Sequence, residues 1–220
     1  MRPLTDAIPK PLLGAGGKPL IVWTIERLAR AGIVELVINH AHLGNQIESL
    51  LGDGRALGVS IRYSPEFAAL ETAGGIAKAL PLLGDDPILV VNGDIYCDYD
   101  YSAAEAIAAA VESRGDLAHL VLVPNPAHHR RGDFCLRAGR VGQADGERLT
   151  FAGIGIYSRD LFVGIAHGAK ARLAPLLQEA VIAGRVSGEC FAGCWMDVGT
   201  PQRLAALDTV LRATTVSGAL

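Results

Sequence analysis

Short apolar runs alternate, along the first two-thirds of the chain, with segments in which hydrophobic residues recur at helical spacing. The runs 36–38, 88–91 and 117–123 are typical of strands that are buried on both faces, and positions 59–63 alternate like a strand. Strands separated by helices predict an α/β domain whose mainly parallel sheet is covered by helices on both faces. The predicted helices cover residues 20–31, 43–51, 75–82 and 103–111.

The pattern changes after Pro124, where strand-like segments become more frequent and the helices between them are shorter. No internal repeat or low-complexity linker separates the two parts, so we predict a single domain over residues 1–220 whose later part adds strands that face substrate. The later predicted elements are strands at 134–137, 150–157 and 187–195 and helices at 176–183 and 201–211.

The composition narrows the class of partner and the compartment. The 220 residues carry a formal net charge of −3 with both signs mixed along the chain, so we predict that the protein does not bind nucleic acid. No apolar run approaches the roughly 20 residues of a membrane-spanning helix. Residues 1–6 lack the apolar region of a secretory signal, so we expect a cytoplasmic protein without a membrane partner. The sequence leaves the oligomeric state open.

Two aspartates stand where carboxylates can bind a cation. Asp94 follows the apolar run 88–91, and ligands of open α/β sheets collect beyond the carboxyl ends of such strands. An ordinary turn is the alternative, because Asn-Gly-Asp also favours turns. Asp197 lies in the apolar segment 195–200, where an isolated charge is costly unless it is paired or coordinates a cation; capping of the local turn is the alternative. Together the two carboxylates could hold one Mg²⁺.

Two further segments suit phosphate and nucleotide binding. Lys10 lies between prolines that restrict the backbone, so its ammonium is held in an extended segment, as the neutralisation of a triphosphate requires. A surface lysine is the alternative. In the segment 71–75, glycines would let the backbone approach a nucleotide closely before a helix begins. The alternative is a plain junction between a loop and a helix.

Taken together, these segments resemble the sugar-1-phosphate nucleotidyltransferase family. The similarity extends over nearly the whole chain and keeps the order and spacing of the motifs. It implies a Rossmann-like, GT-A-like nucleotidyltransferase fold, with a nucleotide-binding part over about residues 1–123 and a sugar-binding part over about residues 124–220. The resemblance is carried by Met-Arg-Pro-Leu-Thr, Pro-Lys-Pro-Leu, Val-Ile-Asn-His-Ala, Ile-Arg-Tyr-Ser-Pro-Glu, Leu-Glu-Thr-Ala-Gly-Gly-Ile, Val-Asn-Gly-Asp, Asn-Pro-Ala-His-His, Arg-Gly-Asp-Phe and Trp-Met-Asp-Val-Gly-Thr.

The resemblance also implies roles for individual residues. Lys10 would bind the triphosphate, and Asp94 and Asp197 would ligate Mg²⁺; these three are the predicted catalytic residues. The implied nucleotide contacts are Lys10, Glu71, Thr72, Gly74, Gly75 and Asn92, and the implied sugar contacts are Asn125 and Asp133.

The implied reaction transfers a uridylyl group from UTP to N-acetylmuramate 1-phosphate, or a similar sugar 1-phosphate, in peptidoglycan recycling. The sugar phosphate oxygen would attack the α-phosphorus of UTP in line and release pyrophosphate. No covalent enzyme intermediate is needed, so the protein positions the substrates and neutralises their charge. The alternatives are a guanylyl- or thymidylyltransferase acting on mannose or glucose 1-phosphate, and a non-catalytic sugar-nucleotide-binding paralogue.

The beginning of the sequence departs from the family pattern. Members of the family place an apolar strand and a loop of the type Leu-Ala-Ala-Gly-x-Gly-x-Arg directly before Met-Arg-Pro-Leu-Thr, which here are residues 1–5. The fold is therefore expected to lack its first strand, which usually lies centrally in such a sheet, and the loop whose N–H groups surround phosphates. A truncated gene start is favoured over a defective paralogue, because the other motifs are intact.

We expect the 220-residue form to fold poorly and to turn over slowly or not at all. An extended form that restores the upstream strand and the Gly-rich loop should recover activity, because it supplies the missing backbone partners and phosphate ligands. Pyrophosphate release by the two forms, compared under the same conditions, checks this expectation. Rapid turnover by the short form would contradict it.

Overall fold

The computed structural model describes residues 1–84, 87–143 and 146–217, which pack as two compact units. Each unit is assembled from separate stretches, so the chain passes from unit 1 to unit 2 and back twice. Unit 1 comprises Met1–Pro65, Asn92–Tyr101 and Gly193–Leu220, and unit 2 comprises Glu66–Val91 and Ser102–Ala192.

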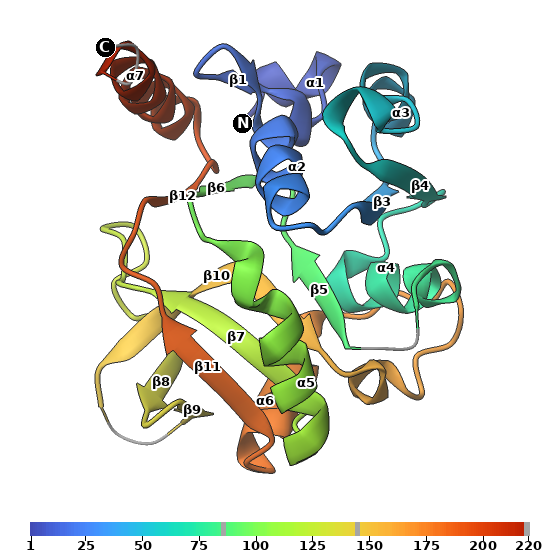
Figure 1. The fold of residues 1–220 in the computed structure, drawn as a ribbon, viewed down its shortest axis with the longest axis vertical. Coiled ribbons are helices and arrows are strands. Elements are labelled where there is room, and N and C mark those ends of the chain that lie inside the picture. Colours follow the sequence, from blue (N-terminus) through green and yellow to red (C-terminus); the bar gives the residue numbers. More distant parts are fainter. Residues whose placement is uncertain (85–86, 144–145, 218–220) are drawn as a thin grey trace. The chain divides into compact units, whose positions relative to one another are not determined.

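Unit 2 is built on a six-stranded sheet with the strand order β5-β10-β7-β11-β9-β8 (Figure 1). The long strand β10 lies between β5 and β7 and runs antiparallel to both, whereas β7 and β11 pair in parallel. The hairpin of β8 and β9 extends the sheet beyond β11. The strands are β5 (Ile88–Val91), β7 (Ala118–Val123), β8 (Phe134–Arg137), β9 (Arg140–Gly142), β10 (Arg148–Tyr157) and β11 (Val186–Cys190).

Helices pack on both faces of this sheet, as the sequence predicts. Figure 1 shows α5 in front of the sheet and α6 behind it. Ala73 of α4 and Leu177 of α6 share a buried core with Leu120 and Leu122 of β7. The helices of unit 2 are α4 (Glu71–Ala79), α5 (Ala104–Arg114) and α6 (Leu173–Ile182), with short 3₁₀ turns η3 (Leu80–Leu82), η4 (Tyr101–Ala103, which begins in unit 1) and η5 (Arg159–Phe162).

The α/β class is confirmed, but the prediction of a mainly parallel sheet is wrong for the described strands. In the sheet of unit 2 only the β7–β11 pair is parallel. The run 117–123 correctly predicts burial, since Leu120, Val121 and Leu122 are almost inaccessible to solvent. The runs 36–38 and 88–91 do not, because residues 36–38 and 89–91 are only half-buried. Burial by helices on both faces does not depend on strand direction, so an apolar run cannot distinguish a parallel from an antiparallel neighbour.

Unit 1 contains a parallel pair of strands, β3 and β4, which packs against α2 and α3. Ile25 of α2, Ile47 of α3 and Ile61 of β4 are buried together in this cluster. The elements of this part are α1 (Leu4–Ala7), η1 (Lys10–Leu12), β1 (Gly14–Ala15), β2 (Lys18–Pro19), α2 (Leu20–Arg30), β3 (Glu35–His40), α3 (Gly44–Leu51), η2 (Arg55–Leu57) and β4 (Ser60–Pro65).

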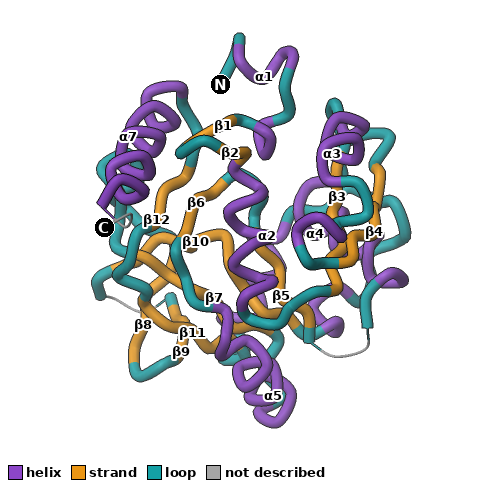
Figure 2. Tube along the Cα trace, turned by 45° about the horizontal axis from the view of Figure 1, so that its top comes forward, coloured by secondary structure: helices purple, strands orange, loops and turns teal. Residues whose placement is uncertain are grey.

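The remaining elements of unit 1 form a two-stranded ribbon and the last helix. β6 (Ile95–Cys97) pairs antiparallel with β12 (Trp195–Asp197), and α7 (Pro201–Ser217) follows β12. Figure 2 shows α2 running beside β6. Leu20 of α2, Tyr96 of β6 and Leu207 of α7 are buried in one cluster. This cluster joins the first and last segments of the chain to the ribbon.

The two units do not follow the predicted division near residue 123, because each unit contains residues from both predicted parts. The nucleotide-binding and sugar-binding roles of those parts stay predictions. No helix within the described ranges is long and apolar enough to cross a membrane. The cytoplasmic location also stays a prediction.

A buried carboxylate in unit 2 is neutralised by an arginine of the β8–β9 hairpin. Asp116 has a side chain that is 4% exposed, and the two terminal nitrogens of Arg140 donate to its oxygens at 2.7 and 2.8 Å. Burial raises the pKa of Asp116, but the hydrogen bonds and charge of Arg140 outweigh burial and hold that pKa below its ordinary value of 3.8. The pair therefore stabilises the fold fully at pH values above the ordinary pKa of the carboxyl group. This stabilisation is lost as the pH falls through the lowered pKa of the folded state.

We expect Arg140→Ala to lower the free energy of unfolding by about 1–2 kcal/mol at neutral pH, less than for a fully buried pair because the Arg140 side chain is 41% exposed. The loss should shrink in acid, as the pH falls below the ordinary pKa of 3.8 and through the lowered pKa of Asp116, where the carboxylate takes up its proton. Urea unfolding at neutral pH and in acid measures it. The matched control is Arg137→Ala, at an exposed position of the same hairpin; an equal loss in both variants would contradict the prediction.

Candidate functional site

The β6–β12 ribbon brings Asp94 and Asp197 together within unit 1. Asp197 stands opposite Ile95, the residue that follows Asp94. One step beyond this pair, the Val198 N–H donates to the Asp94 carbonyl oxygen at 3.2 Å. The two predicted metal ligands therefore lie at the same end of one ribbon, although they are far apart in the sequence.

Lys10 reaches the same end of the ribbon. Its Nζ lies 2.5 Å from Asp94 Oδ2, and the two side chains are 25% and 39% exposed. Pro9 is extended, and the following turn η1 is closed by a hydrogen bond from the Leu13 N–H to the Lys10 carbonyl. The prediction that Lys10 lies in an extended segment is therefore wrong, because Lys10 is the first residue of the 3₁₀ turn η1 and only Pro9 before it is extended. The ammonium contacts a predicted metal ligand, Asp94.

Asp197 is paired with a basic residue that the sequence analysis missed. Arg203 Nη1 lies 2.8 Å from Asp197 Oδ2. Gly199 leaves room for this contact, because a Cβ at that position would collide with the guanidinium of Arg203. The Thr200 hydroxyl accepts from the Arg203 N–H at 3.2 Å, so the turn leads directly into α7. The signal in the sequence was an arginine six residues after Asp197, but whether the two side chains meet depends on the turn between them.

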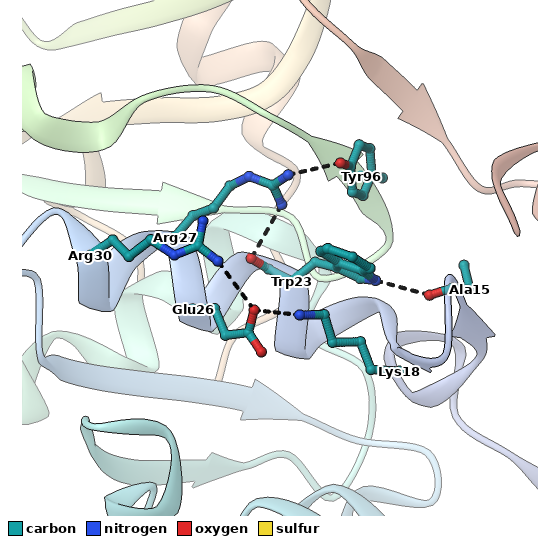
Figure 3. A network of polar contacts seen from close by, with 7 residues as sticks. All are labelled: Ala15, Lys18, Trp23, Glu26, Arg27, Arg30 and Tyr96. Carbon is teal, nitrogen blue, oxygen red and sulfur yellow. Dashed lines mark hydrogen bonds and ion pairs between the residues drawn. The ribbon is translucent and has the colours of Figure 1, made fainter. Parts of the chain in front are cut away.

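A network around Trp23 and Arg27 anchors the ribbon to α2 (Figure 3). Arg27 donates to the Tyr96 hydroxyl at 2.8 Å and to the Trp23 carbonyl at 3.3 Å. The Trp23 indole N–H donates to the Ala15 carbonyl at 2.9 Å, and its ring meets that of Tyr96 edge to face. Because Tyr96 is the middle residue of β6, the network positions the strand that follows Asp94. Ion pairs of Lys18 and Arg30 with Glu26 extend it along α2.

The donor set at the end of the ribbon fits Mg²⁺. Mg²⁺ is usually held by one or two carboxylates, with waters and substrate phosphates completing the coordination. Asp94 and Asp197 supply such a pair. No group of three or more His, Cys, Asp or Glu residues within the described ranges is arranged to hold a metal ion. The arrangement therefore suits a cation shared with a phosphate-bearing substrate rather than one enclosed by protein.

Lys10 also lines a cavity of about 630 Å³ within unit 1. This volume lies in the range of small-molecule sites. The cavity opens between residues 1–11 and the loop that follows β3. The two cations of its lining, Arg2 and Lys10, are each paired with a carboxylate, Asp6 and Asp94. The polar and charged side chains of the lining include Arg2, Asp6, Lys10, Asn39, His40 and His42.

The predicted nucleotide contacts on α4 belong to unit 2. Glu71 opens the helix with a positive φ of 60° and pairs with Lys170 at 3.5 Å, and Thr72 beside it is exposed. Gly74 has a structural reason to be glycine: its N–H donates to the Ala171 carbonyl, and a Cβ would collide with the backbone of residues 169–171. The close approach predicted for a nucleotide is thus made by a loop of the protein itself.

The predicted sugar contacts, Asn125 and Asp133, join one loop of unit 2 to β10. Asn125 donates to the Arg148 carbonyl at 2.7 Å and accepts from the Thr150 hydroxyl at 2.8 Å. The carboxylate of Asp133 accepts from the Phe151 N–H at 2.8 Å and contacts His129 at 2.9 Å. Both side chains thereby hold the loop, and their contact with a sugar stays a prediction.

Of the other predicted nucleotide contacts, Gly75 is buried in the first turns of α4. Asn92 is half-buried directly after β5 and belongs to unit 1, two residues before Asp94. The structure thus groups Lys10, Asn92, Asp94 and Asp197 in unit 1 and the residues of α4 in unit 2. Their predicted roles toward a nucleotide stay predictions.

Comparisons with known proteins point to one family. The Nucleotidyl transferase family profile matches residues 1–134. An N-acetylmuramate alpha-1-phosphate uridylyltransferase from Neisseria meningitidis is 54% identical over 208 residues, which cover 93% of this chain and 90% of the relative. A protein of the same name from Caulobacter vibrioides is 34% identical over 94% of this chain and 90% of its own. A solved structure assigned as a glucose-1-phosphate thymidylyltransferase from Bacillus anthracis shares the fold, with a TM-score of 0.81 at 20% identity over 96% of this chain and 90% of that chain.

We expect Gly74→Ala to lower the free energy of unfolding by about 1–3 kcal/mol, because a methyl group at this buried position must push the 169–171 backbone away. Chemical denaturation measures the effect. Gly84→Ala is the matched control in the same unit, since a Cβ at Gly84 meets open space. A fully stable Gly74→Ala variant that binds nucleotide poorly would show instead that this glycine serves the ligand.

Proposed function

Since the chain belongs to the sugar-1-phosphate nucleotidyltransferase family, we propose that it transfers a uridylyl group from UTP to N-acetylmuramate 1-phosphate and releases pyrophosphate. The 54% identity to the Neisseria meningitidis uridylyltransferase supports the choice of base and sugar. The observation that carries the chemistry is the convergence of Lys10, Asp94 and Asp197 at one end of the β6–β12 ribbon. The reaction is assigned to peptidoglycan recycling in the cytoplasm.

The two substrates are both anionic, so the main obstacle to reaction is charge repulsion. The phosphate oxygen of the sugar attacks the α-phosphorus of UTP, a new P–O bond forms, and the bond from the α-phosphorus to pyrophosphate breaks. Lys10 holds the triphosphate and neutralises part of its charge. No residue needs to form a covalent bond with either substrate, so orientation and electrostatic stabilisation carry the rate.

Asp94 and Asp197 are proposed to hold Mg²⁺ beside the phosphates. When bound, the ion neutralises phosphate charge and fixes the orientation of the reacting group. Lys10 is already within hydrogen-bonding distance of Asp94. Its ammonium can therefore exchange the carboxylate for a phosphate oxygen by a small rotation of the lysine side chain. Asn92, which precedes Asp94 by two residues, is proposed to contact the nucleotide.

The residues of unit 2 are proposed to recognise the rest of the substrates. Glu71, Thr72, Gly74 and Gly75 would contribute the first turn of α4 to the nucleotide, whose approach a helix N-terminus favours. Asn125 and Asp133 would act on the sugar side. Because their side chains already bind the loop to β10, their contribution would be to hold the backbone of that loop in place for the sugar.

A panel of substrates tests the assignment. Each of UTP, GTP and dTTP is combined with N-acetylmuramate, glucose or mannose 1-phosphate, and pyrophosphate release is measured with Mg²⁺ present. The proposal predicts the highest kcat/KM for UTP with N-acetylmuramate 1-phosphate. A preference for GTP or dTTP would support the guanylyl- or thymidylyltransferase alternative. Nucleotide binding without turnover on any pair, in the chain and in its N-terminally extended form, would support a non-catalytic binding protein.

In the N-terminally extended form, Asp94→Asn and Asp197→Asn should each lower kcat/KM by about 100-fold or more, because each removes a charge that the proposed metal site needs. Steady-state pyrophosphate release at saturating Mg²⁺ checks this. Asp53→Asn, an exposed carboxylate of unit 1 away from the ribbon, is the matched control and should keep its rate. Near-normal activity of either ribbon variant would remove that aspartate from the metal site.

A further inference from the structure

The aspartates at the end of the ribbon are each occupied by a cation of the protein itself. Lys10 lies against Asp94, and Arg203 Nη1 lies 2.8 Å from Asp197 Oδ2. The formal charges of these four groups sum to zero. A neutral cluster attracts a free divalent cation far less than two unpaired carboxylates would. The pairs therefore compete with any metal for the same oxygens.

The position of Arg203 is built by the turn between β12 and α7. Gly199 has no Cβ to obstruct the guanidinium, and the Thr200 hydroxyl fixes the Arg203 backbone N–H. The Arg203 side chain is 25% exposed and that of Asp197 34%, so the pair is only partly withdrawn from water. The contact is well oriented and can still be exchanged.

The helix itself opposes a cation at this place. Arg203 lies in the first turn of α7, where the helix dipole is positive and favours anions. Asp197 offsets this unfavourable placement. An anionic phosphate near the same turn would offset it equally well, and an arginine fork binds phosphate oxygens with good geometry. Arg203 thus has two suitable partners, one in the protein and one in a nucleotide.

We propose that Arg203 prevents a divalent cation from binding to Asp197 until a nucleotide is present. The guanidinium of Arg203 then moves from the Asp197 carboxylate to a phosphate oxygen of the nucleotide. This inference rests on the proposed function, because it takes Asp197 as a metal ligand. Arg203 is a positioning residue in the free protein and a phosphate contact in the complex. Metal and nucleotide would then bind together, and the metal alone would bind weakly.

Mn²⁺ serves as the probe, with free Mn²⁺ measured by its electron paramagnetic resonance signal. In the absence of nucleotide, Arg203→Gln should bind Mn²⁺ about five- to tenfold more tightly than the parent chain, because one competing charge is gone. With UTP present and no sugar phosphate, the same variant should bind Mn²⁺ and UTP together several-fold more weakly, because the phosphate contact is lost. Arg203→Lys keeps the positive charge but loses the two-nitrogen fork of the guanidinium. Its Mn²⁺ affinity should therefore lie between those of the parent chain and of Arg203→Gln, both with and without UTP.

Arg212→Gln is the matched control on the same helix. Arg212 pairs with Asp208 at 2.8 Å, away from the ribbon, so this variant should bind Mn²⁺ as the parent does. Thermal unfolding of all variants identifies any loss that comes from a destabilised α7. A change of equal size in Arg203→Gln and Arg212→Gln would overturn the inference, since it would reflect the charge or stability of the helix alone.

Asp197→Asn, alone and combined with Arg203→Gln, separates this inference from the proposed function. If Asp197→Asn weakens Mn²⁺ binding but Arg203→Gln does not tighten it, the blocking role is wrong and the metal site stands. If Asp197→Asn leaves Mn²⁺ binding unchanged in both backgrounds, the metal site itself is wrong. The expected result is that Asp197→Asn removes the gain produced by Arg203→Gln.

Discussion

The pairing of two three-residue strands, β6 and β12, determines where the charged groups of unit 1 can meet. Antiparallel pairing sets Asp197 opposite Ile95 and carries the Val198 N–H to the Asp94 carbonyl. A shift of one residue in this register would turn alternate side chains to the other face of the ribbon. The register is held by the contact of Tyr96 with Arg27 and by the cluster that Tyr96 shares with α7. The chemistry of the site therefore depends on the core that surrounds the ribbon.

The carboxylates of Asp94 and Asp197 lie at the same end of the ribbon and repel each other. Two cations of different chemistry, an ammonium and a guanidinium, neutralise them. Lys10 comes from a proline-restricted segment before the first helix of the core, and Arg203 comes from the first turn of the last helix. An ammonium can rotate freely between partners, whereas a guanidinium binds in a fixed plane. Each carboxylate is thereby neutralised by a side chain of the protein, and both pairs remain partly exposed to solvent. This balance suits a reaction between two negatively charged molecules.

The sequence predicts much of the fold, and its errors have physical causes. The strand at 88–91 agrees with β5, and the helix predicted from Leu20 begins there, after Pro19. The helix predicted from Gly75 begins at Glu71 instead, because Gly74 packs against residues 169–171 and its flexibility is not used for a loop. The strand predicted at 187–195 is two strands, β11 and β12, which belong to different units. Hydrophobic patterns indicate burial, but they do not indicate which unit buries a segment.

The candidate site was also predictable only in part. The motifs around Asp94 and Asp197 led to the prediction that the two carboxylates share one cation, since Asp94 follows one apolar segment and Asp197 lies within another. Arg203 was not predictable, because its contact depends on the absence of a Cβ at Gly199 and on the cap by Thr200. The pairing of opposite charges is decided by turn geometry, which the order of residue types leaves open.

The interleaved path of the chain also affects how the protein can fold during synthesis on the ribosome. Val198 and Leu207 complete the core around Tyr96, so this core cannot close while residues 198–207 are still within the exit tunnel. Most of the sheet of unit 2 can pair before then, and the face of α2 that carries Ile25 can already pack against α3 and β4. Leu20, at the start of α2, would lack its partners from α7 until that segment emerges.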